Sequence, residues 1–342
     1  MGKYIIRRLL QAIPTLFGIT LLTYLLMTAA PGGPAAALSF DPSVSPEQRA
    51  RLEAQLGVND PWIVQYVHWL IGDDWRQRDL DGDGEVDGPG TRRGILRGDF
   101  GNSFSRSRQP VINVISDLVV PTLELTTVSL VVGLVIGLPI GIIAAIGRGG
   151  IFDNTTRVLA VVFNATPNFW LGLILILIFG VWLGALPLSG RCPPSLLEPC
   201  PPVWGRMEYL ILPTITLGTV LIANYSRFMR TSMLEVINQD YMRTARAKGL
   251  SQRDLWFKHG MRNALIPLAT FLGPAITGLL GGAVVTEAVF SWPGLGRATL
   301  NAVTSQDFPL VMGTVILGSV ATILGYILSD ILYAAIDPRI RF

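Results

Sequence analysis

The chain has 342 residues, of which 50% are hydrophobic and only 15% are charged, and its mean hydropathy is +0.47. Soluble domains carry about 25% charged residues, and disorder requires low hydrophobicity with high charge. A disordered chain is therefore excluded, and a soluble enzyme is disfavoured. The net charge of +3 is too small to indicate nucleic-acid binding. Two cysteines and two histidines leave little for a metal cluster or a Cys/His nucleophile.

Six windows without charged residues are each long enough to cross a membrane, which takes about 20 apolar residues. In lipid, only helices and closed barrels satisfy every backbone polar group, and strands are much shorter than these windows. A large helical soluble core is the alternative, and six such windows argue against it. We therefore predict an all-α integral membrane protein with six transmembrane helices. The windows are residues 9–40, 125–147, 158–190, 209–226, 263–286 and 308–329.

The distribution of Arg and Lys predicts the orientation, because cytoplasmic loops are enriched in these residues. They gather before the first window, in residues 148–157, in residues 227–262 and at the end of the chain. The short loops on the opposite side hold only Arg191, Arg206 and Arg297. Both termini are therefore expected in the cytoplasm. The first span, with an apolar run of about 20 residues, is expected to be a retained anchor, because a signal-peptide core is shorter.

Three regions follow from this topology. Residues 1–30 form the cytoplasmic N-terminus and the first helix, and residues 31–118 form an extracytoplasmic region. Residues 119–342 form a core with helices two to six and a cytoplasmic loop at residues 233–262. Within the outer region, Ser45 and Pro46 are expected to start one helix. Asp60 and Pro61 are expected to start another, with Ile63, Tyr66, Val67 and Leu70 at helical spacing.

An acidic segment at residues 79–88 resembles the first part of an EF-hand calcium loop. Acidic side chains alternate along it with a Gly at the sixth position, and Ca²⁺ prefers such converging oxygens. The twelfth position is Gly90, where an EF-hand has a bidentate Glu. The alternative is an acidic, Gly-rich turn; we favour a calcium site. Its ligands would be Asp79, Asp81, Asp83, Glu85 and Asp87.

Cys192 and Cys200 lie in a Pro-rich loop that the topology places outside the cell. Disulfides persist in such oxidising surroundings, and a separation of eight residues is compatible with bond formation. We predict a disulfide in preference to two free thiols. Zinc would need more ligands than this loop contains.

Motifs for autonomous catalysis are missing from the sequence. It has no G-x-x-x-x-G-K-[ST], H-E-x-x-H, C-x-x-C or G-x-S-x-G. The acids near the spans, Glu124, Glu287 and Asp330, are separated in sequence and are interpreted as interfacial residues or as residues in helix contacts. We expect no catalytic residues and no cofactor apart from the calcium ion. A channel or transport role remains, with energy supplied by another protein.

The cytoplasmic loop contains a short helix with signals at both ends. Asp240 is a suitable N-cap, and Gly249 can end the helix in the left-handed conformation. Ser251 and Asp254 resemble a capping box that starts the next helix. Helical spacing puts Tyr241, Ala245 and Lys248 on one face. Such a helix can lie in a groove of a partner, although an ordinary basic loop is the alternative.

These residues resemble a known family, the permeases of bacterial ABC importers for dipeptides and oligopeptides. The resemblance rests on residues 241–251 and 259–267 in this loop. Further matches are the opening residues 4–14 with Ala30-Pro31-Gly32, residues 287–297, and the ending 337–341. Together they cover nearly the whole chain except about residues 73–98. In the wider superfamily the loop reads A-A-x-x-x-G and then I-x-L-P. Residues 244–249 fit the first half, and residues 259–262 replace the second.

The resemblance implies a type I ABC importer permease in a bacterial inner membrane. It would pair with a second, homologous permease, with two cytoplasmic ATPases that bind ATP and Mg²⁺, and with an extracytoplasmic binding protein. Nucleic acid is not an expected partner, whereas membrane lipid is. Nickel or another small solute is an alternative cargo, and an integral membrane enzyme is the alternative class. The ATPase-docking residues would be Tyr241, Arg243, Thr244, Ala245, Arg246, Ala247, Lys248, Gly249 and Ser251.

Two further features bear on transport. Gly133, Gly137 and Gly141 form a stripe of small residues that permits close helix packing, although glycine is common in membrane helices. The loop after the fifth window is expected outside the membrane. There, Trp292 is either an interfacial anchor or part of an external gate. For the gate, or for contact with the binding protein, the candidates are Glu287, Trp292, Leu295 and Arg297.

Overall fold

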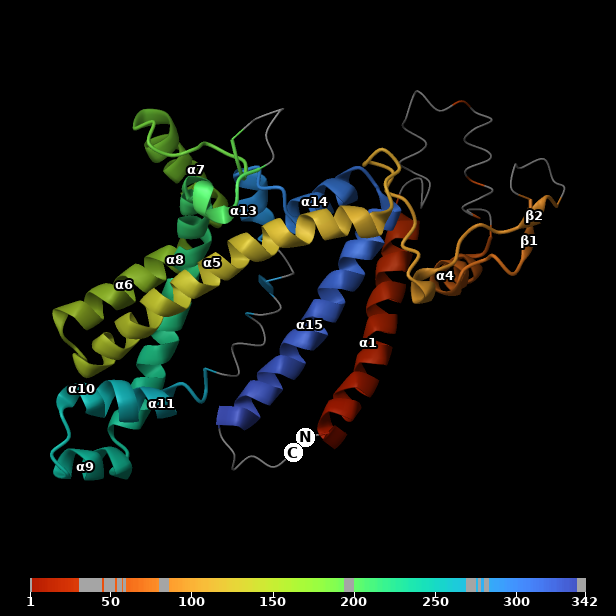
Figure 1. The fold of residues 1–342 in the computed structure, drawn as a ribbon. Helices are drawn as coiled ribbons and strands as arrows, with labels where there is room; N and C mark the ends of the chain where they lie inside the picture. Colours follow the sequence, from red (N-terminus) through yellow and green to blue (C-terminus); the bar gives the residue numbers. More distant parts are fainter. Residues whose placement is uncertain are drawn as a thin grey trace. The chain divides into compact units, whose positions relative to one another are not determined.

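The computed structural model is mainly helical (Figure 1). It describes residues 2–30, 45, 53, 57, 60–79, 86–193, 200–268, 275, 278, 279 and 283–336. The chain forms two compact units. The terminal unit comprises Gly2–Val119 and Ala298–Val320, and the core unit comprises Val120–Arg297 and Ala321–Phe342.

The long helices are α1 (Gly2–Ala29), α5 (Val111–Ile146), α6 (Ile151–Ala165), α8 (Met207–Ile237) and α15 (Phe308–Ile336). The shorter α-helices are α4 (Trp62–Ile71), α7 (Asn168–Leu175), α9 (Asp240–Ala247), α10 (Gln252–Asp254), α11 (Met261–Ala264), α13 (Val284–Val289) and α14 (Leu295–Thr304). Two segments are π-helical, η3 (Ile176–Trp182) and η5 (Leu255–Gly260), and two are 3₁₀-helical, η2 (Ile95–Arg97) and η4 (Val203–Gly205). Strands β1 (Gln77–Arg78) and β2 (Gly88–Pro89) pair antiparallel. The predicted all-α class is confirmed.

Four described helices are long and apolar enough to cross a membrane. These are Ile6–Ala29, Val111–Ile146, Met207–Ile237 and Phe308–Ile331, which match the first, second, fourth and sixth windows. The fifth window, residues 263–286, falls largely outside the described residues. The count of six helices therefore stays a prediction.

The third window is not one straight helix. Its residues form α6 and then α7 with η3, and the two parts are bent by 98° at a short break. The break lies at Thr166 and Pro167, where Thr166 is extended, with φ −77° and ψ 123°. A residue before proline is disfavoured in the helical region, so this dipeptide ends α6. If the bent pair is one span, the described spans number five.

In the core unit, α5 packs closely against α8 through the glycine stripe. A Cβ at Gly133 would meet the side chain of Leu221, and one at Gly141 would meet the backbone of Ser226. A Cβ at Gly137 would lie 3.1 Å from the carbonyl oxygen of Ile222. Because glycine has no Cβ, the two backbones approach each other here. The predicted role of the stripe in close helix packing is confirmed.

The terminal unit has an aromatic core between α1, α4 and the start of α15. The Tyr24 ring meets the rings of Tyr66 and Phe308 edge-on, at centroid distances of 5.3 and 5.1 Å. The Tyr66 hydroxyl lies 2.9 Å from the Thr20 hydroxyl. Helix α4 begins at Trp62, as its sequence predicts, but its inward face differs from the expected one. Ile63 and Val67 are exposed, whereas the polar Gln65 is buried because it bonds the Tyr24 hydroxyl and the Asp60 carbonyl.

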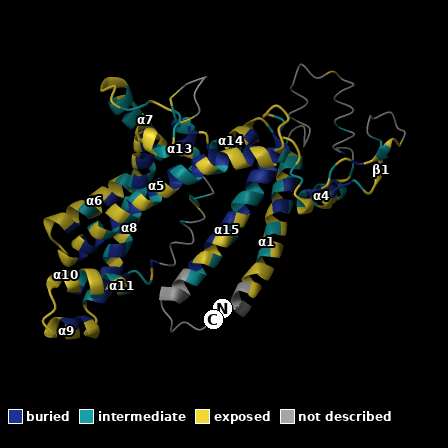
Figure 2. Cartoon of the chain, in the orientation of Figure 1, coloured by how far each residue is buried: buried dark blue, intermediate teal, exposed yellow. Residues whose placement is uncertain are grey.

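Helix α1 leaves most of its described apolar side chains exposed or half-buried along its whole length (Figure 2). Ile6, Leu10, Ile13, Leu22 and Leu26 are each more than half exposed. Apolar exposure on this scale would be unfavourable in water. It is the expected condition of a helix whose outer surface faces lipid.

Candidate functional site

The short cytoplasmic helix is rigidly attached to the core unit. Met242 and Ala245 of α9 are buried in one cluster with Met229 and Met233 of α8 and Leu255 of η5. Helix α9 therefore has an apolar inner face, although only two of its eight residues are buried. The side chains that join α9 to α8 come from positions 229, 233 and 236, which are spaced by helical turns.

The helix ends are built largely as the sequence predicts. Gly249 has a φ of +76°, the left-handed conformation that glycine adopts without strain. The Ser251 hydroxyl accepts a hydrogen bond from the Asp254 backbone N–H at 3.1 Å, as in a capping box. The N-terminal cap differs by one residue: Gln239 is the cap, and Asp240 is the first helical residue. Its carboxylate pairs with the nearby Arg243 guanidinium at 3.4 Å.

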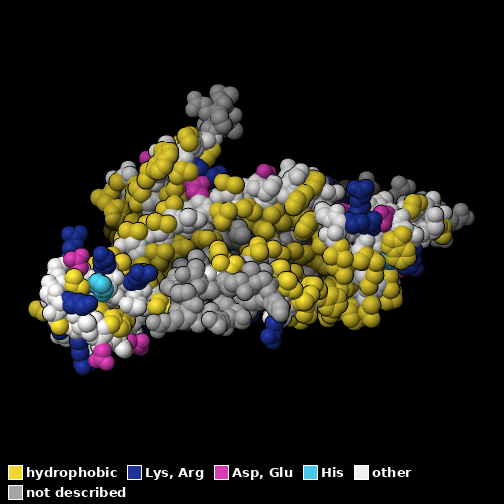
Figure 3. Space-filling view, turned by 60° about the horizontal axis from the view of Figure 1, so that its bottom comes forward, with side chains coloured by type: hydrophobic (Ala, Val, Ile, Leu, Met, Phe, Trp, Pro, Cys, Tyr) yellow, Lys and Arg dark blue, Asp and Glu magenta, His cyan; other side chains and the backbone are white. Residues whose placement is uncertain are grey.

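The outer face of α9 is exposed and basic. Most of the predicted docking residues lie on it: Tyr241, Arg243, Thr244, Arg246, Ala247 and Lys248, followed by Gly249 and Ser251. Ala245 does not, because its side chain packs inward and is buried, so it is not available to a partner. The Arg246 guanidinium lies 5.7 Å from the centroid of the Trp256 ring. Figure 3 shows Lys and Arg side chains gathered at this end of the core unit, on the left.

Tyr241 keeps 42% of its surface exposed. Partial burial nevertheless raises the pKa of its hydroxyl. Like any tyrosine hydroxyl, it is protonated near neutral pH and can donate a hydrogen bond to a partner. Together with the arginines, it gives the outer face of α9 hydrogen-bond donors and positive charge.

On the opposite side of the core unit, Glu287 of α13 is fully buried. Its Oε1 accepts a hydrogen bond from the Thr122 hydroxyl, and its Oε2 accepts one from the Arg297 backbone N–H, both at 2.9 Å. The carboxylate thus caps the first turn of α14, where unpaired N–H groups favour negative charge. A Cβ at Gly294 would collide with it. Glu287 does not face a vestibule, contrary to the gate prediction, because this cap holds it inside.

Trp292 is also fully buried, and it is not an interfacial anchor. Its indole N–H donates to the Pro121 carbonyl of α5 at 2.9 Å, and its ring packs with Leu125 and Leu210. Leu295 is 3% exposed. Of the four candidates for an external gate or binding-protein contact, only Arg297 keeps a partly exposed side chain. The loop therefore packs α13 against α5. Burying its apolar side chains is more favourable in free energy than leaving them exposed to water.

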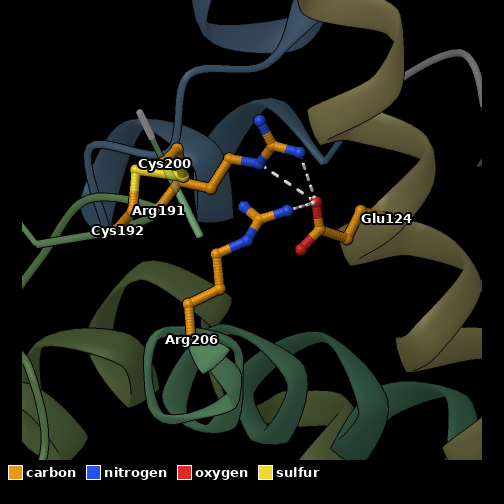
Figure 4. The surroundings of a disulfide bond; sticks show 5 residues. All are labelled: Glu124, Arg191, Cys192, Cys200 and Arg206. Atoms are coloured by element: carbon orange, nitrogen blue, oxygen red, sulfur yellow. Dashed lines mark hydrogen bonds and ion pairs between the residues drawn. A yellow bond between two sulfur atoms is a disulfide. The ribbon is translucent and has the colours of Figure 1, made fainter. Parts of the chain in front are cut away.

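An ion triad that the sequence analysis missed lies nearby (Figure 4). Glu124 Oε2 accepts hydrogen bonds from Arg191 at 2.6 Å and from Arg206 at 2.9 Å. Glu124 and Arg206 are almost completely buried. Of the two interpretations of Glu124, the interfacial one is therefore wrong, because the carboxylate is buried in an ion cluster inside the core unit. Only the fold brings together three charges separated by 67 and 82 residues in sequence.

The disulfide lies beside this triad (Figure 4). Cys192 follows Arg191 directly and is bonded to Cys200, with a Cα–Cα distance of 5.7 Å. The bond closes the loop from which Arg191 reaches Glu124. It therefore restricts the positions that this arginine can take.

The acidic segment at residues 79–88 is largely outside the described residues, which include Asp79 and Asp87 but not Asp81, Asp83 or Glu85. It joins β1 to β2, so strands flank it where an EF-hand has helices. Among the described residues, no group of three or more His, Cys, Asp or Glu side chains could hold a metal. Calcium binding is thus unsupported by the described part and stays a prediction.

Apolar helices of membrane length, together with an exposed basic helix, are the features of a multi-pass membrane protein. Comparison with models of known protein families identifies the family. A model described as "Binding-protein-dependent transport system inner membrane component" matches residues 137–342, and the model of the N-terminal part of that component matches residues 1–126. The chain therefore belongs to the family of binding-protein-dependent inner-membrane transport components.

Curated relatives match along the whole chain. The oligopeptide transport system permease protein AppB of Bacillus subtilis is 38% identical, with all of both chains covered. The dipeptide transport system permease protein DppB of Escherichia coli K12 is 37% identical, covering all of this chain and 99% of the relative. The glutathione transport system permease protein GsiC of the same strain is also 37% identical over the full length of both.

Among solved structures, a chain of the MetNI methionine ABC transporter in an inward-facing form aligns with a TM-score of 0.50. It is 22% identical and covers 65% of this chain and 96% of that one, which indicates a shared fold. The chain is a permease subunit of an ABC importer and not an enzyme, since separate ATPase subunits hydrolyse ATP in such importers. The predicted family and class are confirmed.

Proposed function

We propose that the chain forms half of the translocation path of an ATP-driven importer for dipeptides or oligopeptides. The cargo class follows from relatives named for oligopeptide, dipeptide and glutathione transport at nearly equal identity. All three cargoes are short peptides. The other half of the path would be a second, homologous permease.

The observation that carries the proposal is the construction of α9. Its inner face is fixed to α8 by Met242 and Ala245, while the side chains of its outer face are exposed. A short helix fixed on one side transmits displacement along its axis, because it cannot yield independently of α8. Laid in a groove of an ATPase, it would couple closure of the two cytoplasmic ATPases, which hold ATP and Mg²⁺, to movement of α8.

The proposed topology places α9 and both termini in the cytoplasm of a bacterial cell. It rests on the concentration of Arg and Lys in residues 227–262. The triad and the disulfide then lie on the extracytoplasmic side, where a binding protein would deliver the peptide. Among the four predicted contact residues, Arg297 is the one that could meet that protein, because its side chain is partly exposed.

The test uses the assembled complex, purified through a tag on this chain and reconstituted in proteoliposomes. We expect ATP-dependent uptake of a labelled dipeptide or hexapeptide, and no ATP-dependent uptake of nickel. Charge reversal on α9, Arg243→Glu with Lys248→Glu, should release the ATPases and abolish uptake. The matched pair Arg253→Glu with Lys258→Glu reverses two charges outside α9 and should retain the ATPases. If both pairs released the ATPases and abolished uptake to the same extent, only the overall basic charge of the loop would matter. That result would reject the docking role of α9.

A further inference from the structure

Two adjoining cavities lie between α5, α6 and α8 in the core unit, at the end near the turn that joins α5 to α6. One has a volume of 330 Å³ and is lined mainly by polar residues, including Arg148, Asp153, Arg157 and Arg230. The other has a volume of 210 Å³ and an almost entirely apolar lining, including Ile140, Ala144, Ala160 and Val161. Arg157 and Arg230 line both, so the two cavities are neighbours.

The basic cavity has more positive charge than its own acid can neutralise. Asp153 is fully buried, and both of its oxygens accept hydrogen bonds from Arg230, at 2.5 and 2.7 Å. The Gly149 backbone N–H donates to the same carboxylate at 2.8 Å. Arg230 is thereby committed to Asp153. Arg148 and Arg157 form no ion pair with an acid within 4.0 Å among the residues that the structure describes, although the charge of Arg157 acts on Asp153, and both side chains are exposed. They are available to an external anion.

The apolar cavity opens beside an apolar surface. Val158, Val161 and Val162 on the outer side of α6 are each at least half exposed. A small hydrophilic anion would satisfy the arginines and leave this apolar groove empty. An amphiphile with an anionic head and a hydrocarbon chain would satisfy both cavities at once. Basic pockets between membrane helices on the cytoplasmic side are suited to anionic lipid headgroups.

We propose that this composite cavity binds one anionic phospholipid. Its phosphate would lie between Arg148 and Arg157, and one acyl chain would occupy the groove beside Ala144, Ala160 and Val161. The proposed topology assigns the lipid to the cytoplasmic leaflet, and this assignment alone rests on the proposed function. Arg230 lies on α8, ten residues before the start of α9, so the lipid would stabilise the end of α8 that leads into α9.

The test measures lipid retention by the complete complex in nanodiscs that contain equal parts of phosphatidylglycerol and phosphatidylcholine. Native mass spectrometry after detergent release should show preferential retention of phosphatidylglycerol. Arg148→Gln with Arg157→Gln should lower this preference roughly ten-fold, because two basic residues near a lipid surface contribute strongly to anionic lipid binding. Arg148→Lys with Arg157→Lys should retain most of it. Arg253→Gln with Lys258→Gln removes two charges elsewhere and should leave it unchanged.

A second variant distinguishes binding of a lipid from binding of free phosphate. Val161→Trp narrows the apolar groove without removing charge, and it should reduce retention of phosphatidylglycerol. The proposal would be overturned in favour of a simple anion site by two results together. Inorganic phosphate would displace the lipid from the wild type, and it would bind equally well to Val161→Trp. Unchanged lipid retention in Arg148→Gln with Arg157→Gln would also overturn it. Neither measurement needs ATP or cargo, so failure here is distinct from failure of the transport proposal.

Discussion

The carboxylate of Glu287 accepts a hydrogen bond from the backbone N–H of Arg297, ten residues later in the chain. This bond folds the loop back on itself and closes the first turn of α14 with a buried negative charge. Gly294 makes the approach possible, because a Cβ there would occupy the place of the carboxylate. In the sequence Ser-Trp-Pro-Gly-Leu-Gly-Arg, Gly294 therefore leaves the space that the Glu287 carboxylate occupies. This contact fixes the conformation of the loop.

Gly294→Ala should destabilise the purified complex by about 1–3 kcal/mol, because either the carboxylate or the helix turn must move and leave polar groups unpaired. Thermal unfolding in detergent is the measurement, with a lower melting temperature expected. Gly318→Ala is the matched control, since a Cβ there meets no atom within 4 Å. An unchanged melting temperature in Gly294→Ala would show that the loop adapts at no cost.

Glu124→Gln should destabilise the complex by about 3–5 kcal/mol, because it leaves two arginine charges without their buried acid. Glu208→Gln removes an exposed carboxylate near the start of α8 and should cost less than about 1 kcal/mol. Urea or thermal denaturation of both variants gives the comparison. Similar losses in the two variants would show that the triad has no special role.

Gly249→Val should uncouple the ATPases while the chain still inserts. The left-handed conformation costs a residue with a Cβ roughly 1 kcal/mol or more, and this strain falls at the end of α9. Substrate-stimulated ATP hydrolysis by the complex should fall strongly. Gly98→Val introduces the same strain at a φ of +79°, in open space within the terminal unit, and stimulation should persist. Wild-type stimulation in Gly249→Val would contradict the coupling role.

Met242→Ala should loosen α9, because it removes the largest buried side chain that fixes this helix to α8. The expected local cost is about 2–5 kcal/mol. Hydrogen exchange of the α9 amides, measured by mass spectrometry, should become faster. Tyr241→Ala changes the exposed neighbour and should leave these exchange rates nearly unaltered, although it alters the outer face. Equal acceleration in both variants would mean that α9 is not held by its inner face.

Removal of the disulfide, by Cys192→Ser with Cys200→Ser, should destabilise the loop by about 2–3 kcal/mol, since a cross-link over eight residues restricts the unfolded chain. Mass spectrometry of unreduced peptides should show the two cysteines linked in the wild type. Complete alkylation of both thiols without reductant would contradict this prediction.

The sequence alone determined the class of the protein and most of the construction of α9. Charge-free windows of membrane length permit helices, because no other open structure satisfies the backbone in lipid. Gly249 and Ser251 act through their own backbone neighbours, so local sequence is sufficient to predict them. The glycine stripe of α5 also predicted close packing against another helix, but only the fold identified that helix as α8. The Thr166-Pro167 break carried a local signal too, but the length of the apolar window concealed it.

Only the tertiary structure decided which charged and aromatic residues are buried. Glu124 meets arginines that lie 67 and 82 residues away in sequence, and Trp292 bonds a carbonyl 171 residues away. Taken one at a time, these side chains look like interfacial or gate residues. An isolated buried charge or indole N–H is unfavourable, and burial becomes acceptable only when a partner satisfies it. Since those partners come from distant segments, the fold had to bring them together before their role was visible.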